Sequence, residues 1–184
     1  MNIFFLDADP KQAAMWLVDA HVVKMILESA QMLSTAHRLL DGIQEIIVSN
    51  NRKKKYYKLY DERESIVYGA THINHPSNIW CRTSVKNYLW LVEHMMYIGQ
   101  EYQARYGKVH SCFSSGLFYY LQSPPYNLKK FDFTPIPCAM DKKYIISDDP
   151  VINYRNYYKF GKAHLHSWKI KERKPYWIAV GDME

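Results

Sequence analysis

Two long stretches of apolar residues at helical spacing, each framed by helix start and stop signals, constrain most strongly what this chain can fold into. The first follows Asp9-Pro10, where Asp is a favourable N-cap and Pro is tolerated at the first helical position, and it runs to Gly42. Such a span of about 30 residues is long for one globular helix, so we expect Asp19 to interrupt it and cap a second helix. The other stretch, 84–106, ends at Gly107, a natural left-handed helix stop.

The rest of the chain carries shorter patterns. Residues 3–6 are apolar but too few for periodicity to separate a strand from an extended buried segment, and we favour the latter. The β-branched residues 43–48 precede a polar stretch, 49–55, which indicates an exposed loop. Prolines break residues 110–141 into loops and short helical turns, whereas Asp149-Pro150 predicts a last helix reaching about His166. We therefore expect one compact, mainly α-helical domain, 1–184, with long helices and irregular, proline-rich connections.

Composition indicates a folded protein with an anionic partner. Of the 184 residues, 48% are hydrophobic and 15% aromatic, which is enough apolar surface to exclude disorder. Lys and Arg total 24 against 18 Asp and Glu, and the resulting formal charge of +6 suits DNA or a nucleotide. No apolar run is long enough for a signal peptide or membrane span, and three scattered cysteines fit a reducing compartment. We expect a cytoplasmic protein with no membrane partner, and the sequence leaves its oligomeric state open.

The first long helix carries a narrow polar stripe. At 100° per residue, the side chains that share a sector of about 100° are His21, Lys24, Glu28, Gln31, Thr35 and Arg38. An imidazole, an amine and a carboxylate one or two turns apart influence one another's protonation, as an acid–base site requires. The candidates for catalysis are His21, Lys24 and Glu28, and those for ligand binding are Gln31 and Arg38. The alternative is an ordinary solvated face with one Lys24–Glu28 pair.

The second long helix has a similar stripe. The side chains within about 60° of one another are Asn87, Trp90, His94, Glu101 and Arg105. The two stripes could face each other across a cleft, with Trp90 as a stacking surface for a base. The binding candidates on this helix are Asn87, Trp90, His94 and Arg105. The alternative places Trp90 in the core and makes Glu101–Arg105 a surface pair.

A third set of candidates lies towards the C-terminus, where cations alternate with aromatic rings. The binding candidates are Tyr154, Arg155, Tyr157, Tyr158 and Lys162. This composition is typical of proteins that bind single strands or flipped bases, although a basic run can equally be a solvated surface. Pairs of histidines at 72 and 75, or 164 and 166, could supply two metal ligands, but no zinc motif accompanies them. Neither a metal nor a cofactor is expected.

Three patches of the sequence resemble the small phage-type pyrimidine-dimer DNA glycosylases. Asp19-Ala20-His21 followed by Glu28 is similar to that family's Asp-x-His and the catalytic Glu seven residues after the His. Residues 88–107 and 157–163 look like its long later helix and its Tyr-rich, Gly-Lys-Ala terminus. The patches cover about a third of the chain, which has extra sequence near residues 43–75 and 108–148. The resemblance implies a phage or large-virus protein acting in the host cytoplasm, with Glu28 as catalytic carboxylate and His21 lining a damaged-DNA site.

Two features of that family do not carry over to this chain. In the family a processed N-terminal amine attacks the sugar, whereas Asn2 is too large for routine removal of Met1, so we expect no such amine at the family's position. The family also has arginines one residue before and three after its catalytic Glu, where this chain has Leu27 and Gln31. The sequence therefore departs from the family's lesion-flipping residues, and the scaffold could serve another nucleotide substrate.

The function that these patterns favour is an enzyme acting on DNA or a nucleotide, most nearly a DNA glycosylase for a modified or damaged base, with Glu28 as acid or base. Lys24 is a spare amine that could form a Schiff base if burial and Arg38 lowered its pKa, and otherwise Glu28 would activate water. The alternative is a non-catalytic binder of a nucleotide or nucleic acid, such as a phage counter-defence protein that sequesters a nucleotide signal.

Overall fold

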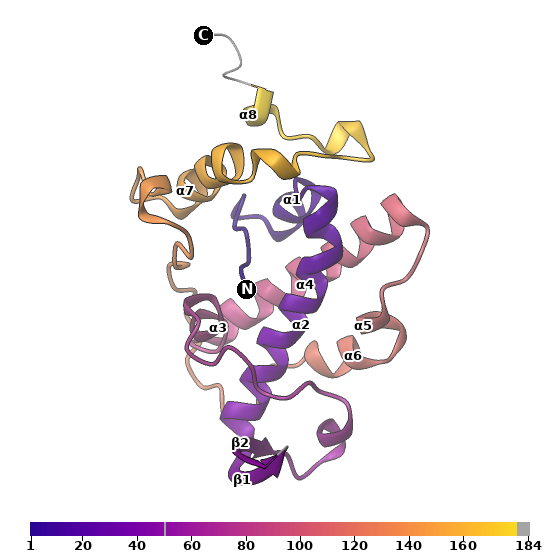
Figure 1. Cartoon of the computed structure of the whole chain (residues 1–184), viewed down its shortest axis with the longest axis vertical. Helices are drawn as coiled ribbons and strands as arrows, with labels where there is room; N and C mark the ends of the chain where they lie inside the picture. Colours follow the sequence, from indigo (N-terminus) through magenta and orange to yellow (C-terminus); the bar gives the residue numbers. More distant parts are fainter. Residues whose placement is uncertain (50, 180–184) are drawn as a thin grey trace.

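The computed structural model describes residues 1–49 and 51–179, and its secondary structure is mainly α-helical (Figure 1). The α-helices are α1 (Pro10–Met15), α2 (Asp19–Asp41), α3 (Pro76–Cys81), α4 (Val85–Tyr106), α5 (Ser111–Ser114), α6 (Leu117–Leu121), α7 (Pro150–Asn156) and α8 (Tyr176–Ala179). Shorter helical turns are η1 (Glu62–Ser65), η2 (Lys142–Tyr144), η3 (Tyr157–Gly161), η4 (Ala163–Leu165) and η5 (Lys171–Arg173). No described helix combines the length and the apolar character needed to cross a membrane.

The first helical stretch forms where the sequence predicts it and is broken near Asp19. The Asp9 side chain accepts the Lys11 N–H and Pro10 occupies the first helical position, so α1 starts as expected. The residue that precedes α2 is Val18, which has no side-chain acceptor, while Asp19 is the first helical residue. The predicted break is therefore confirmed, but the prediction that Asp19 caps α2 is wrong, because its carboxylate binds other segments instead.

The second long helix, α4, has the predicted bounds. The Ser84 hydroxyl accepts the Asn87 N–H at its start, and Gly107 ends it with a φ of 65°. Helix α4 packs against both α1 and α2, which places the two long helices at the centre of the molecule (Figure 1). Their buried apolar side chains form one core together with residues 3–6. That first segment is buried without strand pairing, as predicted, but it is not extended throughout, because Phe4 has a φ of 53° and the Leu6 N–H donates to the Phe4 carbonyl.

A β-hairpin projects from the end of α2 and replaces part of the predicted loop (Figure 1). Strands β1 (Ile43–Ser49) and β2 (Arg52–Lys58) pair antiparallel, with Ile43 opposite Lys58. The prediction of a loop over 49–55 is wrong at Ser49 and from Arg52 onward, where the chain forms strands, and position 50 lies outside the described residues. Residues 52–55 are polar because they lie in an exposed two-stranded ribbon. A strand with solvated faces accommodates cations.

The C-terminal helix starts at its predicted signal but changes geometry. Asp149 accepts the Val151 N–H and Pro150 follows it, so α7 begins as expected. The α-helix stops at Asn156, and the chain continues as the wider turn η3 and then η4, rather than as one helix to about His166. At Gly161 the backbone passes close to two aromatic rings. An added Cβ there would lie 2.6 Å from a ring carbon of Tyr157 and 2.8 Å from a ring carbon of Tyr144. Only glycine fits there.

Candidate active site

A buried carboxylate with amines on either side lies in the middle of α2. The Glu28 side chain is only 10% exposed, and its Oε2 accepts the backbone N–H of Asn2 at 2.8 Å. The α-ammonium of Met1 lies 3.8 Å from the same oxygen, and the Lys24 ammonium lies 3.2 Å from Oε1. The family-like Glu28 is therefore paired with two amines, one of them from the start of the chain. Met1 brings its own α-amino group to a place where we expected no amine.

The side chain of Asn2 fixes the start of the chain and ties it to the segment at Ala139. Its Oδ1 accepts the N–H groups of Ile3 and Phe4 at 2.7 and 2.9 Å, and its Nδ2 donates to the Ala139 carbonyl at 2.9 Å. The Met1 side chain is 1% exposed. A residue whose side chain is buried and whose neighbour makes three hydrogen bonds has little freedom, so the α-amino group is held beside Glu28.

His21 lies two turns before Glu28 as a neutral imidazole. Its Nδ1 is 2.8 Å from the Tyr158 hydroxyl, which also accepts the Val18 N–H at 2.8 Å. Among the described residues, Nδ1 is the one acceptor within reach of the Tyr158 hydroxyl proton, so we assign that proton to the bond with Nδ1 and the His21 proton to Nε2. Burial, followed by the charges of Lys162, Lys24 and His164, lowers the pKa of His21 to about 3. His21 therefore contributes a neutral ring close to three potential cations.

The Phe4 ring covers His21 and connects it to the start of the chain. The two rings stack with centroids 4.1 Å apart, and Phe4 adopts a φ of 53°. Bulky side chains rarely take such a backbone conformation, so the surrounding contacts must hold it there. Residues 2–4 thus place both the amine and the aromatic cover of the site.

A second histidine approaches the amine from α3. His75 is half-buried, and its Nδ1 accepts the Ser77 N–H at 3.2 Å. Burial lowers the pKa of His75, and the positive charges of the chain start and of His72 lower it further, while Glu28 opposes them. The amine and carboxylate therefore lie within electrostatic reach of His75. Within residues 1–49 and 51–179, no three His, Cys, Asp or Glu side chains are grouped closely enough to hold a metal ion.

The other predicted site residues of α2 separate in space. The Lys24 side chain is 65% exposed and Gln31 is half-buried, so both are accessible near Glu28. Arg38 is buried and its guanidinium binds Glu64 and the carbonyls of Tyr57, Tyr68 and Val67. Arg38 anchors the hairpin and η1, so the expectation that Arg38 and burial activate Lys24 is not met.

The predicted binding stripe of α4 lies inside the protein. Asn87 donates to the Trp80 carbonyl, Trp90 to Ala8 and His94 to Pro10, and all three side chains are buried. The Trp90 ring packs against Phe5 and Trp80. The expected cleft between the two helices is therefore wrong, because the N-terminal segment and α1 cover this face of α4.

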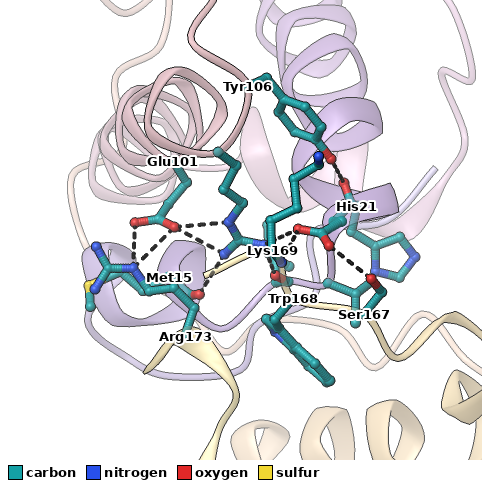
Figure 2. Close-up of polar contacts among 12 residues, drawn as sticks. Met15, His21, Glu101, Tyr106, Ser167, Trp168, Lys169 and Arg173 are labelled. Carbon is teal, nitrogen blue, oxygen red and sulfur yellow. Dashed lines mark hydrogen bonds and ion pairs between the residues drawn. The ribbon is translucent and has the colours of Figure 1, made fainter. Parts of the chain in front are cut away.

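Arg105 is at the centre of a buried ionic network that anchors the C-terminal segment (Figure 2). Its guanidinium binds Glu101 at 3.0 Å, Asp19 at 3.2 Å and the carbonyls of Met15 and Leu17. Asp19 also accepts from Ser167 and from the Lys169 backbone, and Glu101 pairs with Arg173, as Figure 2 shows. The network connects α2 and α4 to the C-terminal segment, and the Arg105 side chain has no exposed surface for a ligand.

The C-terminal aromatic candidates divide into core and surface residues. Tyr154 and Tyr158 are fully buried, and the Tyr154 hydroxyl donates to the Pro137 carbonyl. Arg155 pairs with Asp7 and lies over the rings of Trp16 and Trp177. Tyr157 and Lys162 remain half-buried and contact each other, with the Lys162 ammonium 5.1 Å from the ring centroid. These two are the candidates from this segment that a ligand can reach.

Sequence reasoning did not identify Met1, Asn2 or His75 as parts of the site. The contact between Asn2 and Glu28 spans 26 residues, and no local pattern near Met1 indicates it. Comparisons with family models, with curated proteins and with solved structures found no match to this chain.

Proposed function

We propose that the protein cleaves the bond between a base and its sugar in DNA or in a nucleotide, using an amine held beside Glu28. The observation that carries the proposal is the convergence of the Met1 α-amino group, the Asn2 N–H and Lys24 on one buried carboxylate. A carboxylate in that position can take a proton from an ammonium and stabilise the positive charge that develops on the sugar.

In the proposed reaction, Glu28 and the amine have separate tasks. Glu28 accepts a proton from the ammonium, and the neutral amine then forms a bond to C1′ of the sugar. The base leaves with the electron pair of the glycosidic bond and takes up a proton. The bonded nitrogen then loses a proton, its electron pair opens the C1′–O4′ bond, and O4′ takes up that proton. The resulting protonated imine is hydrolysed by water or undergoes elimination.

Of the two amines, the α-amino group of Met1 is the better nucleophile. The buried Met1 side chain and the hydrogen bonds of Asn2 hold this amine beside Glu28, so it is already positioned for attack. The Lys24 side chain is 65% exposed. Arg38, the cation that we expected to act on Lys24, is bound to Glu64 instead. We assign Lys24 to contacts with phosphate at the rim of the site.

Borohydride trapping on a DNA duplex containing an abasic site tests this proposal without knowledge of the base. The wild-type protein and Lys24→Ala should form a covalent adduct, and peptide mass spectrometry should locate it on Met1. A variant extended by two residues before Met1 should form at least about 10²-fold less adduct, because its amine is displaced from Glu28. The matched control carries the same extension at the C-terminus.

Two results would contradict the proposal in different ways. An adduct on Lys24 would show that Lys24, and not Met1, is the nucleophile, with Glu28 still as the carboxylate beside it. No adduct, on the abasic duplex or on DNA with oxidised or dimerised bases, together with retained DNA or nucleotide binding, would favour the non-catalytic binder.

A further inference from the structure

The β-hairpin is strongly basic and projects away from the core (Figure 1). It carries Arg52, Lys53, Lys54, Lys55 and Lys58 against a single carboxylate, Glu45, in a protein with a formal charge of only +6. The Glu45 carboxylate accepts a 3.0 Å hydrogen bond from the Tyr60 hydroxyl. The ribbon therefore has a formal charge of +4 and is one of two strongly basic segments of the chain, the other being residues 159–174.

The strand register divides the hairpin into two faces. Directly opposed residues share a face, so one face consists of Gln44, Ile46, Val48, Lys53, Lys55 and Tyr57. Ile46 and Val48 are 57% and 70% exposed, and each lies opposite a lysine. We call this the outer face. It contains apolar side chains and cations but no carboxylate.

The opposite face is attached to the body of the protein. Tyr56 donates to Glu64, and Arg38 donates to the Tyr57 carbonyl at 3.2 Å. At the start of the ribbon, a Cβ on Gly42 would lie 2.4 Å from the Arg38 carbonyl oxygen, so the close approach requires glycine. The base of the ribbon is thus held by buried Arg38, which leaves the outer face to meet a partner.

From these observations we propose that the hairpin enters the major groove of double-stranded DNA, with Ile46 and Val48 against base edges and Lys53 and Lys55 on the phosphates. The major groove of B-form DNA is about 12 Å wide and admits a two-stranded ribbon. Strands of seven residues extend about 23 Å, which is more than half a helical turn of DNA. Apolar side chains suit thymine methyl groups, whereas lysines supply contacts without sequence preference.

This inference rests on the proposed function in taking nucleic acid as the substrate class, and it specifies a duplex polymer rather than a free nucleotide. Double-stranded RNA fits poorly, because its major groove is deep and narrow. An exposed strand also carries lysines to prevent edge pairing, but that role concerns the ribbon's edges and does not explain apolar residues on its outer face.

The experiment measures anisotropy of a labelled DNA duplex of about two helical turns, with duplex RNA, single-stranded DNA and mixed nucleoside monophosphates as competitors. Replacing Lys53 and Lys55 together by Gln should weaken duplex DNA binding at least about tenfold and lower the slope of log affinity against log salt by roughly two. The matched control replaces the exposed Lys86 and Lys108 by Gln and should change affinity less than about threefold.

A second variant separates groove contacts from charge. Ile46→Thr with Val48→Thr keeps the β-branched shape, and it should weaken duplex binding by about fivefold or more while leaving the salt slope unchanged. Duplex RNA or free nucleotides competing as well as duplex DNA would overturn the inference. The inference would also be overturned if the hairpin variants bound duplex DNA like the wild type, including the case in which their solubility alone decreased.

Glu28→Gln distinguishes the two proposals. It should retain hairpin-dependent DNA binding, because Glu28 lies on α2 outside the ribbon. If trapping fails while hairpin-dependent binding persists, the proposed glycosidic chemistry is wrong and the DNA-binding hairpin stands. If trapping succeeds and the hairpin variants bind normally, the glycosidic chemistry stands and the DNA-binding role of the hairpin is wrong.

Discussion

The backbone N–H of Asn2 donates a 2.8 Å hydrogen bond to Oε2 of Glu28, which joins the first residues of the chain to the middle of its longest helix. The carboxylate is therefore neither a solvated surface group nor an isolated buried charge. It compensates the α-ammonium of Met1 and the Lys24 ammonium, and it satisfies a backbone donor. We expect stability and the proposed chemistry both to depend on this contact, and suitable substitutions separate the two effects.

Glu28→Gln and Glu28→Ala should differ in stability but not in activity. Gln retains an oxygen for the Asn2 N–H and should cost about 1 kcal/mol, whereas Ala leaves that donor unpaired and should cost about 1–3 kcal/mol. Both should reduce borohydride trapping by about 10²-fold or more, because neither accepts the amine proton. Urea unfolding and trapping on abasic DNA measure the two effects. Wild-type trapping by Glu28→Gln would remove Glu28 from the mechanism.

The neighbouring tyrosines 157 and 158 should respond differently to loss of their hydroxyl groups. Tyr158→Phe leaves the Val18 N–H and the His21 Nδ1 without a partner inside the core, at a cost of about 1–3 kcal/mol. Tyr157→Phe is the matched control at a half-buried position and should change stability by less than about 0.5 kcal/mol. Thermal unfolding of both variants tests the assignment. Equal losses would mean that the Tyr158 hydroxyl contributes little.

Glu101 should stabilise the protein far more than Arg173, although the two form one ion pair. Glu101→Gln removes a counter-charge from the fully buried Arg105 and should cost about 3 kcal/mol, because breaking one side of a buried pair leaves a charge uncompensated. Arg173→Gln breaks the same pair from its 29% exposed side and should cost less than about 1 kcal/mol. Chemical denaturation compares them. A larger effect at Arg173 would contradict the network shown in Figure 2.

Stability should fall as the pH is lowered from about 6.5 towards 4. Burial is the largest cause of the lowered pKa at three histidines, to about 3 at His21 and to about 4 at His37 and His94. Below pH 6.5 the unfolded chain binds protons that the folded chain excludes, so each histidine favours folding above pH 6.5 and loses this contribution on acidification. These three histidines together contribute up to about 4 kcal/mol per pH unit to the slope, and His75 and His110, whose pKa values burial also lowers, add to it.

Urea midpoints at pH 7.5 and 5.0 measure this dependence. His37→Gln keeps groups that can bond to Arg63 and Tyr88 but does not titrate, so it should reduce the slope by up to about a third. Carboxylates titrate mainly below this window and therefore contribute little to it. Equal stability at the two pH values would show that these histidines accept protons in the folded state.

Local signals in the sequence determined where the helices begin and end. Asp9, Ser84 and Asp149 each accept a backbone N–H two or three residues ahead, and Gly107 takes the left-handed conformation that stops α4. Such contacts involve only neighbours along the chain, so they can be predicted without knowing the fold. The same reasoning could not predict the β-hairpin, because strand pairing depends on residues across the turn.

The helical wheel also grouped side chains correctly by face, but it could not show what covers each face. Trp90 and His94 share one face of α4, as the wheel predicted, and they are buried because their partners are the carbonyls of Ala8 and Pro10, more than 80 residues earlier. Glu28 is placed beside an amine by a contact with Asn2. Periodicity thus determined the helices and their polar stripes. Only long-range packing, which local propensity does not encode, decided which stripe became core and which became a site.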